Sequence, residues 1–319
     1  MMFVKTIRNF SLALSCLVAL SSGVGAQPSE RSYVYKTPEE AVSALIAATK
    51  ADDKVEILAI LGTNVKDLID SGDETADSSE RETFVAAYEE KHAIVRDKEG
   101  RAILEVGAQS WPFPIPLVLE KKDNEWVFDG KTGIEEVLDR RIGRNELSAI
   151  EVMSAYVDAQ GEYYRLNPDQ SVVRHFAPRI ASRPGKHDGL YWQTGEGEKP
   201  SPLGPLVAQA EREGYAAVSQ DVDRPYHGYR YRVLTGQGKH AKGGAYSYIE
   251  DDLMFGGFGL IAYPDTYGVS GVMTFIVNQD GVVYEKNLGQ DTAVSVRKID
   301  MFDPDDTWHA FEFGESRDK

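Results

Sequence analysis

The spacing of apolar residues changes twice along this chain from a helical period to an alternating one, and this order limits the folds open to it. Residues 37–53 start with Thr37, Pro38 and Glu40, the spacing of a capping box with proline at the first helical position. Apolar residues follow at helical spacing. From His92 onward apolar and polar residues alternate between turn sequences, as in strands. Helices followed by strands predict an α+β unit.

The same order recurs in the second half of the chain. Residues 132–142 predict a short closing helix, and residues 145–166 predict a long helix capped by Asn145. A short helix over residues 203–213 follows. Residues 229–233 then alternate tyrosine and valine with arginine, as a half-buried strand does, and four further segments read as antiparallel strands.

These patterns predict two α+β domains, residues 37–143 and 144–319, after a polar leader over residues 27–36. We place the boundary near Gly143. In the first domain we also expect a loop over residues 67–81, followed by a helix capped by Ser79.

The first 26 residues have the three parts of a secretory signal. Lys5 and Arg8 precede a short apolar run, and small residues ending at Ala26 form the expected cleavage site. Cys16 lies inside the apolar run, so we do not expect lipidation there. Cleavage would remove this single cysteine, which excludes disulfides and thiol chemistry in the exported chain. We expect a bacterial periplasmic or secreted protein with no membrane insertion after cleavage.

Charge narrows the classes of partner. The net charge of the chain is −16, and cleavage would remove two of its 35 basic residues. A strongly acidic surface repels phosphate backbones and anionic lipids, which argues against nucleic-acid partners. No cofactor motif is complete, and we expect no cofactor.

Asp280 and Gly281 stand between two alternating segments. Asp-Gly in this context is a strong hairpin signal, because a type I′ turn needs positive φ at both central residues. We expect such a turn, with Gln279 and Val282 as the flanking cross-strand pair, and we assign Asp280 no chemistry.

Several long segments together resemble one family. They are residues 111–120 (WPFPIPLVLE), 185–192 (GKHDGLYW), 201–210 (SPLGPLVAQA), 226–249 and 267–292. In this order they resemble exported bacterial proteins grouped as domain of unknown function 2950. That resemblance spans about Thr37 to Trp308 and carries no activity, cofactor or catalytic residue to transfer.

Two weaker resemblances concern architecture. The first domain resembles the nuclear-transport-factor-2-like cone of helices on a curved antiparallel sheet. The second, a long helix plus an antiparallel sheet, resembles the globular part of pilins and pseudopilins. A prepilin leader is absent and the helix over residues 145–166 is polar, so this likeness concerns fold and not filament assembly.

Two loops hold the best candidates for a site. An imidazole beside a carboxylate can act as general base or metal ligand, and an aromatic ring can stack on a sugar, but ordering of a long loop explains the same residues. The ligand-binding candidates are Lys186, His187, Tyr191, Trp192, Lys239 and His240. The catalytic candidates are His187, Asp188 and His240.

Other polar and aromatic groups carry weaker signals. Glu250, Asp251 and Asp252, and likewise Asp303, Asp305 and Asp306, lack the spacing of a calcium loop, and we expect no metal site. In the first domain a cone could enclose a pocket, although plain core packing explains its aromatic residues better. Those residues are Tyr88, His92, Trp111, Phe113 and Trp126.

Three functions remain open. We favour a non-catalytic envelope protein that binds a protein, peptide or glycan through the loops around His187 and His240. The alternatives are an envelope hydrolase using His187 with Asp188 or carboxylates assembled by the fold, and a structural component beside a secretion or pilus apparatus. The hydrolase requires His187, His240 and a carboxylate to meet in a cleft.

Overall fold

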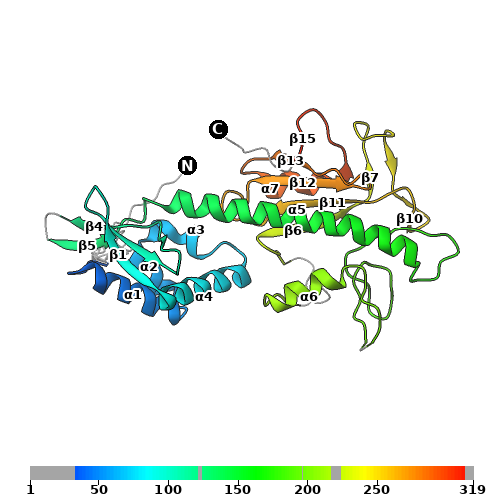
Figure 1. Cartoon of the computed structure of the whole chain (residues 1–319). Helices are drawn as coiled ribbons and strands as arrows, with labels where there is room; N and C mark the ends of the chain where they lie inside the picture. Colours follow the sequence, from blue (N-terminus) through cyan, green and yellow to red (C-terminus); the bar gives the residue numbers. More distant parts are fainter. Residues whose placement is uncertain (1–32, 121–123, 196, 217–223, 313–319) are drawn as a thin grey trace, which may run out of the picture. The chain divides into compact units, whose positions relative to one another are not determined.

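The structure is a computed structural model that describes residues 33–120, 124–195, 197–216 and 224–312. The predicted export signal lies outside these residues. In the described part, helices and mainly antiparallel sheets form an α+β fold, as the sequence predicts (Figure 1). The helices are α1 (Pro38–Lys50), α2 (Lys54–Leu61), α3 (Lys66–Ile69), α4 (Glu74–Glu90), α5 (Ile134–Leu166), α6 (Gly204–Arg212) and α7 (Thr292–Ser295), with 3-10 turns η1 (Thr63–Val65) and η2 (Val296–Lys298).

Two larger sheets organise the strands. The first has the order β1–β2–β4–β5, with β3 also paired to β2, and the second has the order β15–β13–β12–β11–β6. The strands of the first are β1 (His92–Arg96), β2 (Ala102–Val106), β3 (Trp111–Pro112), β4 (Leu117–Glu120) and β5 (Glu125–Phe128). Those of the second are β6 (Tyr229–Leu234), β11 (Gly259–Pro264), β12 (Met273–Asn278), β13 (Tyr284–Asn287) and β15 (His309–Ala310). Smaller pairings join β7 (Gly236–Gln237), β8 (Tyr246–Ser247) and β14 (Met301–Phe302), and β9 (Ile249–Glu250) with β10 (Leu253–Met254).

The first core lies between α1, α2 and the first sheet. The Thr37 hydroxyl caps α1 by accepting a hydrogen bond from the Glu40 N–H at 3.1 Å, as predicted. The Glu40 carboxylate accepts from the Lys36 N–H and not from the Thr37 N–H. The helix then buries its apolar stripe, including Val42 and Leu45, against the sheet residues of the same cluster.

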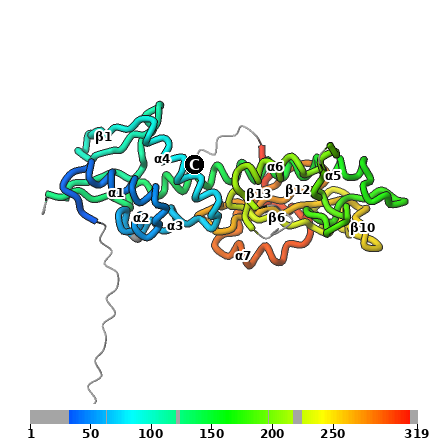
Figure 2. The backbone as a smooth tube through the Cα atoms, turned by 90° about the horizontal axis from the view of Figure 1, so that it is seen from below, coloured from blue at the N-terminus to red at the C-terminus, as the bar shows by residue number. Residues whose placement is uncertain are grey.

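The second sheet is buried on both faces. Along β11, Leu260 and Ala262 belong to the core cluster that includes α5, whereas Ile261 belongs to a smaller cluster on the opposite face. Along β12, Phe275 and Ile276 divide in the same way. This two-residue period is the one expected for a strand, and it continues in the predicted inward tyrosines of β6. Figure 2 shows these strands gathered together along α5.

The two helices predicted around Gly143 are one continuous helix, so that prediction is wrong. A Cβ atom added at Gly143 would meet nothing within 4 Å, and an interior glycine costs a helix only about 1 kcal/mol. Just before Gly143, the Arg141 side chain fixes the helix by donating hydrogen bonds to the Asp67 and Leu68 carbonyls. Asn145 does not cap a helix, because its side-chain amide donates to the Ser270 carbonyl at 2.9 Å.

The first turn of α4 also differs from the prediction. The helix starts six residues earlier than expected, because the cap is Asp73 and not Ser79. One Asp73 carboxylate oxygen accepts from the Ala76 N–H at 3.1 Å. The first turns of α4 contain few apolar residues, so the spacing of apolar residues does not predict them.

The hairpin between β12 and β13 exists, but its turn is not type I′. Only Gly281 has positive φ (75°), and Ile276 pairs with Tyr284, so Gln279 and Val282 do not face each other. The Gly281 N–H donates to the Asn278 carbonyl, and the Asn278 side chain accepts from the Asp280 N–H. These bonds favour a tighter turn with Gln279 and Asp280 at its centre. Gly281, which follows them, takes the left-handed conformation.

The core clusters draw on separate parts of the chain, residues 35–134 in one and residues 149–311 in another. A domain boundary near Gly143 stays a prediction, and α5 crosses it. In the described part of the chain no helix combines the length and apolar character required to span a bilayer.

Candidate functional site

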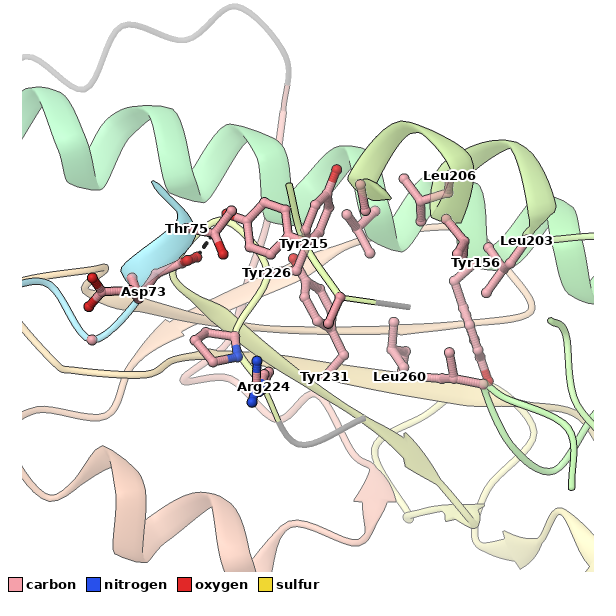
Figure 3. A pocket seen from close by; sticks show the side chains of 18 residues that line it. Asp73, Thr75, Tyr156, Leu203, Leu206, Tyr215, Arg224, Tyr226, Tyr231 and Leu260 are labelled. Carbon is pink, nitrogen blue, oxygen red and sulfur yellow. Dashed lines mark hydrogen bonds between the residues drawn. The ribbon is translucent and has the colours of Figure 1, made fainter. Parts of the chain in front are cut away.

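A cavity of about 490 Å³ lies among the start of α4, the helix α6 and the strand β6. We call it the tyrosine pocket. Figure 3 shows Tyr215, Tyr226 and Tyr231 together, with Asp73 and Thr75 at one end of the group. Apolar side chains and one further tyrosine lie at the other end. These residues are Tyr156, Leu203, Leu206 and Leu260.

A tight turn places two of the tyrosines. Tyr226 and Tyr229 exchange backbone hydrogen bonds in both directions, at 2.8 and 3.1 Å. The residues between them, His227 and Gly228, have φ of 49° and 72°, as a two-residue type I′ turn requires. This turn brings Tyr226 to the pocket just before β6 begins, and Tyr231 lies in the same strand.

Asp73 joins this turn to the start of α4. Its carboxylate, in a residue only 2% exposed, accepts from the Tyr215 hydroxyl and the Gly228 N–H, both at 2.9 Å, and caps α4 through Ala76. Buried carboxylates need such donors, because removal from water is costly without them. One side chain therefore fixes the start of α4, the turn before β6 and the ring of Tyr215.

The Tyr231 hydroxyl is the unusual group in the wall. It is buried and has no hydrogen-bond partner among the described residues, although Tyr231 lines the pocket. A buried hydroxyl without a partner costs about 1–3 kcal/mol. A ligand that supplied the missing bond would remove this cost.

The pocket tyrosines remain protonated over the ordinary pH range. Burial, followed by the nearby Asp73 carboxylate, raises the pKa of Tyr215, and burial, followed by Glu213, raises the pKa of Tyr226. Burial also raises the pKa of Tyr231 well above its usual value. Their hydroxyls therefore act as neutral hydrogen-bonding groups and not as phenolate nucleophiles.

An acid–imidazole pair lies beside the pocket. Glu213 accepts from the Tyr226 hydroxyl at 3.2 Å and lies 2.9 Å from the His227 ring. Burial alone would raise the pKa of Glu213, but hydrogen bonds from Gln209, His227 and Tyr226 and the charge of His227 hold it below its usual value. The pair orients Tyr226 and the turn. Among the described residues that line the pocket, none is His, Cys, Lys or Ser.

The family model described as "Protein of unknown function (DUF2950)" matches residues 32–311. The chain belongs to this family. The comparison confirms the resemblance found from the sequence. No curated protein and no solved structure matches the chain.

In this DUF2950 protein, His187 and Asp188 do not form a pair. The His187 ring packs on Trp192 with centroids 4.6 Å apart, and its Nδ1 lies 3.4 Å from the Pro168 carbonyl. Asp188 accepts from the Arg183 backbone N–H at 2.9 Å and side-chain Nε at 2.5 Å. Burial would raise the pKa of Asp188, but Arg183 and Arg179 hold it below its usual range. The carboxylate therefore orders the loop.

His240 belongs to a different arrangement. Its ring nitrogen lies 3.1 Å from an Asp303 oxygen that also accepts from the His240 backbone N–H at 2.8 Å. Lys186, Lys239, His187 and His240 are all exposed. In the described structure no hydrogen bond or ion pair joins the two histidines. These contacts do not bring His187, His240 and a carboxylate together, as the hydrolase alternative requires.

The loop with His187 still contributes to the tyrosine pocket. The Tyr191 N–H donates to the carbonyl of Ile180, and Ile180 lines the cavity. Trp192 and Tyr191 pack against the core that includes α5. Part of the predicted binding loop thus supports the pocket wall, through backbone pairing and packing.

The acidic groups do not gather around a cation site in the described residues, where no cluster of three or more His, Cys, Asp or Glu has suitable geometry. Asp251 and Asp252 form the positive-φ turn between β9 and β10. Asp303 binds His240, and Asp305 accepts from the N–H of Thr307.

The sequence patterns do not identify the residues that build the tyrosine pocket as a binding site. Tyr231 was predicted to point inward, but Asp73 and Tyr215 carried no signal of their own. The sequence Tyr226-His227-Gly228-Tyr229 could have indicated a two-residue turn that presents aromatic rings. Which carboxylate meets that turn depends on tertiary contacts.

Proposed function

We propose that this chain is an exported binding protein of the bacterial cell envelope that holds a small, largely apolar molecule in the tyrosine pocket. The observation that carries the proposal is the buried Tyr231 hydroxyl, which lacks a partner in the wall of a cavity lined mainly by apolar side chains. Ligand sites are concave and apolar, with a few polar groups that fix orientation. The ligand therefore has an aromatic or aliphatic body and one hydrogen-bonding group.

The surroundings favour binding over bond cleavage. The pocket tyrosines stay neutral, and Asp73 uses its oxygens on Ala76, Tyr215 and Gly228. A catalytic site needs a nucleophile or base free to exchange a proton, with a partner that activates it. The apolar walls instead offer shape, and the Tyr231 hydroxyl offers a directional bond.

Paired ligands test the role of Tyr231. Fluorescence titration should show that 2-naphthol binds about threefold to tenfold more tightly than naphthalene, the value of one neutral hydrogen bond. Tyr231→Phe should reduce this ratio to about one. Equal affinities for the wild-type protein would contradict the proposed bond.

A matched pair of variants tests the location. Ala210 lines the pocket, whereas Ala208 is exposed on the same helix. Ala210→Phe should abolish binding of 2-naphthol, and Ala208→Phe should leave it unaltered. Binding that survives Ala210→Phe in a folded protein would place the ligand elsewhere.

Export is proposed on the pattern of residues 1–26. Mass spectrometry of the chain recovered from the periplasm or medium should show Gln27 as the first residue. Recovery of the uncleaved chain from the cytoplasm alone would contradict export.

A further inference from the structure

A second cavity, of about 810 Å³, lies in the other core, between α4 and the elements around it. We call it the α4 cavity. Its apolar wall includes Leu45, Ile57, Leu61, Phe84, Val106 and Phe113. Two of the predicted aromatic residues, Trp111 and Phe113, line it, whereas Trp126 is buried core and Tyr88 stacks on His92.

Two complementary polar atoms on α4 have no hydrogen-bond partner among the described residues. They are the Asp77 Oδ1 acceptor and the Arg81 Nη2 donor, and both residues line the cavity. The Asp77 side chain is 1% exposed and that of Arg81 is 12% exposed. Residues four apart lie on the same helix face, with Cβ atoms about 5–6 Å apart. One ligand group can therefore reach both.

The neighbouring charges do not complete these bonds. Arg141 Nη2 lies 3.8 Å from Asp77 Oδ1, beyond hydrogen-bond distance, and donates instead to the Leu68 carbonyl and to Glu80. Arg81 uses Nε on Asp52 at 2.6 Å, and its Nη2 lies 4.0 Å from Glu74. Unmet bonds of this kind cost about 1–3 kcal/mol each when buried, more for charged groups.

The charge pattern selects the class of ligand. Arg81, Arg140, Arg141 and Arg144 line the cavity and disfavour a cation, while Asp77 and Glu80 disfavour an anion at the same place. A neutral group that donates and accepts side by side meets both demands. A primary carboxamide has this arrangement, with N–H beside C=O.

We propose that the α4 cavity binds an apolar molecule bearing an uncharged carboxamide, whose N–H donates to Asp77 and whose carbonyl accepts from Arg81. The apolar body of the ligand packs against the aliphatic and aromatic wall. This site is separate from the tyrosine pocket and shares none of its lining residues.

Three eight-carbon probes of different charge test the selectivity. Calorimetric titration of the exported chain at pH 8 should show octanamide binding at least tenfold more tightly than octanoate or octylamine. Asp77→Asn places an amide where the acceptor oxygen stood, so the preference for octanamide over octanoate should fall at least tenfold. Equal affinities for the three probes in the wild-type protein overturn the proposal.

Matched alanines locate the site. Ala87 lines the cavity, and Ala86, its neighbour on α4, is exposed. Ala87→Leu should abolish octanamide binding, and Ala86→Leu should not change it. If Asp77→Asn does not fold, Arg81→Gln replaces it, with an expected loss of at least tenfold in octanamide affinity. Wild-type affinity in Ala87→Leu overturns the location. Ala210→Phe, which alters only the tyrosine pocket, should leave octanamide binding intact.

Discussion

The carboxylate of Asp73 accepts a hydrogen bond from the hydroxyl of Tyr215 at 2.9 Å, across 142 residues of sequence. The same oxygen accepts from the Gly228 N–H. The close approach of neighbouring Gly72 to Asp265, where an added Cβ atom would lie 2.4 Å from a carboxylate oxygen, supports the same junction. The start of α4 is thus fixed against the turn that opens β6.

Asp73→Ala should lower the free energy of unfolding by about 3 kcal/mol, because three donors lose a buried charged acceptor. Urea unfolding measures the change. Asp70, an exposed acid three residues earlier, supplies the control, and Asp70→Ala should change stability by less than about 0.5 kcal/mol. Similar effects of the two variants would show that Asp73 is not the organising group.

Two tyrosine-to-phenylalanine changes should have opposite effects. Tyr231→Phe removes a buried hydroxyl that lacks a partner, so stability should be unchanged or rise by about 1 kcal/mol. Tyr215→Phe removes a donor to Asp73, so stability should fall by about 1–2 kcal/mol. Thermal and urea unfolding of the two variants give the comparison. A clear loss in Tyr231→Phe would mean that its hydroxyl has a partner in solution.

Asp77 should make stability depend on pH in a direction unusual for a carboxylate. Burial raises its pKa, with a smaller contribution from Glu80, despite opposing hydrogen bonds from Ser71 and the charge of Arg141. Above the unfolded-state pKa of about 3.9, the folded protein therefore holds this proton more tightly than the unfolded chain, and stability falls as pH rises through the folded-state pKa.

Asp77→Asn removes this titration. The free energy of unfolding of the variant minus that of the wild type should increase between pH 4 and pH 7. Urea unfolding at each pH measures the difference, in which the other titrating groups cancel. A difference that is flat or decreases over this range would contradict the raised pKa.

The continuity of α5 predicts contrasting effects of alanine at two glycines. Gly143→Ala should raise stability by about 0.4–1 kcal/mol, because the position is helical and the added Cβ meets nothing within 4 Å. Gly133→Ala should be strongly destabilising, since Gly133 has φ of 90° and an added Cβ would overlap the Pro114 carbonyl. A destabilising Gly143→Ala would indicate a break in the helix.

Local sequence signals predicted much of the fold. Thr37 caps α1, α6 lies within the predicted residues 203–213, and β6 alternates as expected. Each of these features depends on a few neighbouring residues. The predicted break at Gly143 is wrong, because contacts made by Arg141 and Asn145 with distant segments hold a continuous helix there.

The candidate site was much less accessible from sequence. Asp188 stands next to His187 in the chain, yet its oxygens bind Arg183. Asp73, in a segment predicted as a loop, instead meets Tyr215 and Gly228 from the other half. Polar residues that are adjacent in sequence, such as His187 and Asp188, stabilise the loop that contains them. The pocket is built from segments far apart in sequence, and their contacts depend on tertiary packing.

The most direct test of the tyrosine pocket is an NMR titration with 2-naphthol, using protein labelled on its tyrosine rings and assigned by single Tyr→Phe variants. Resonances of Tyr215, Tyr226 and Tyr231 should move together and saturate, while those of Tyr246, in β8, stay in place. Movement of Tyr191 or Tyr246 with no change at Tyr231 would contradict the account.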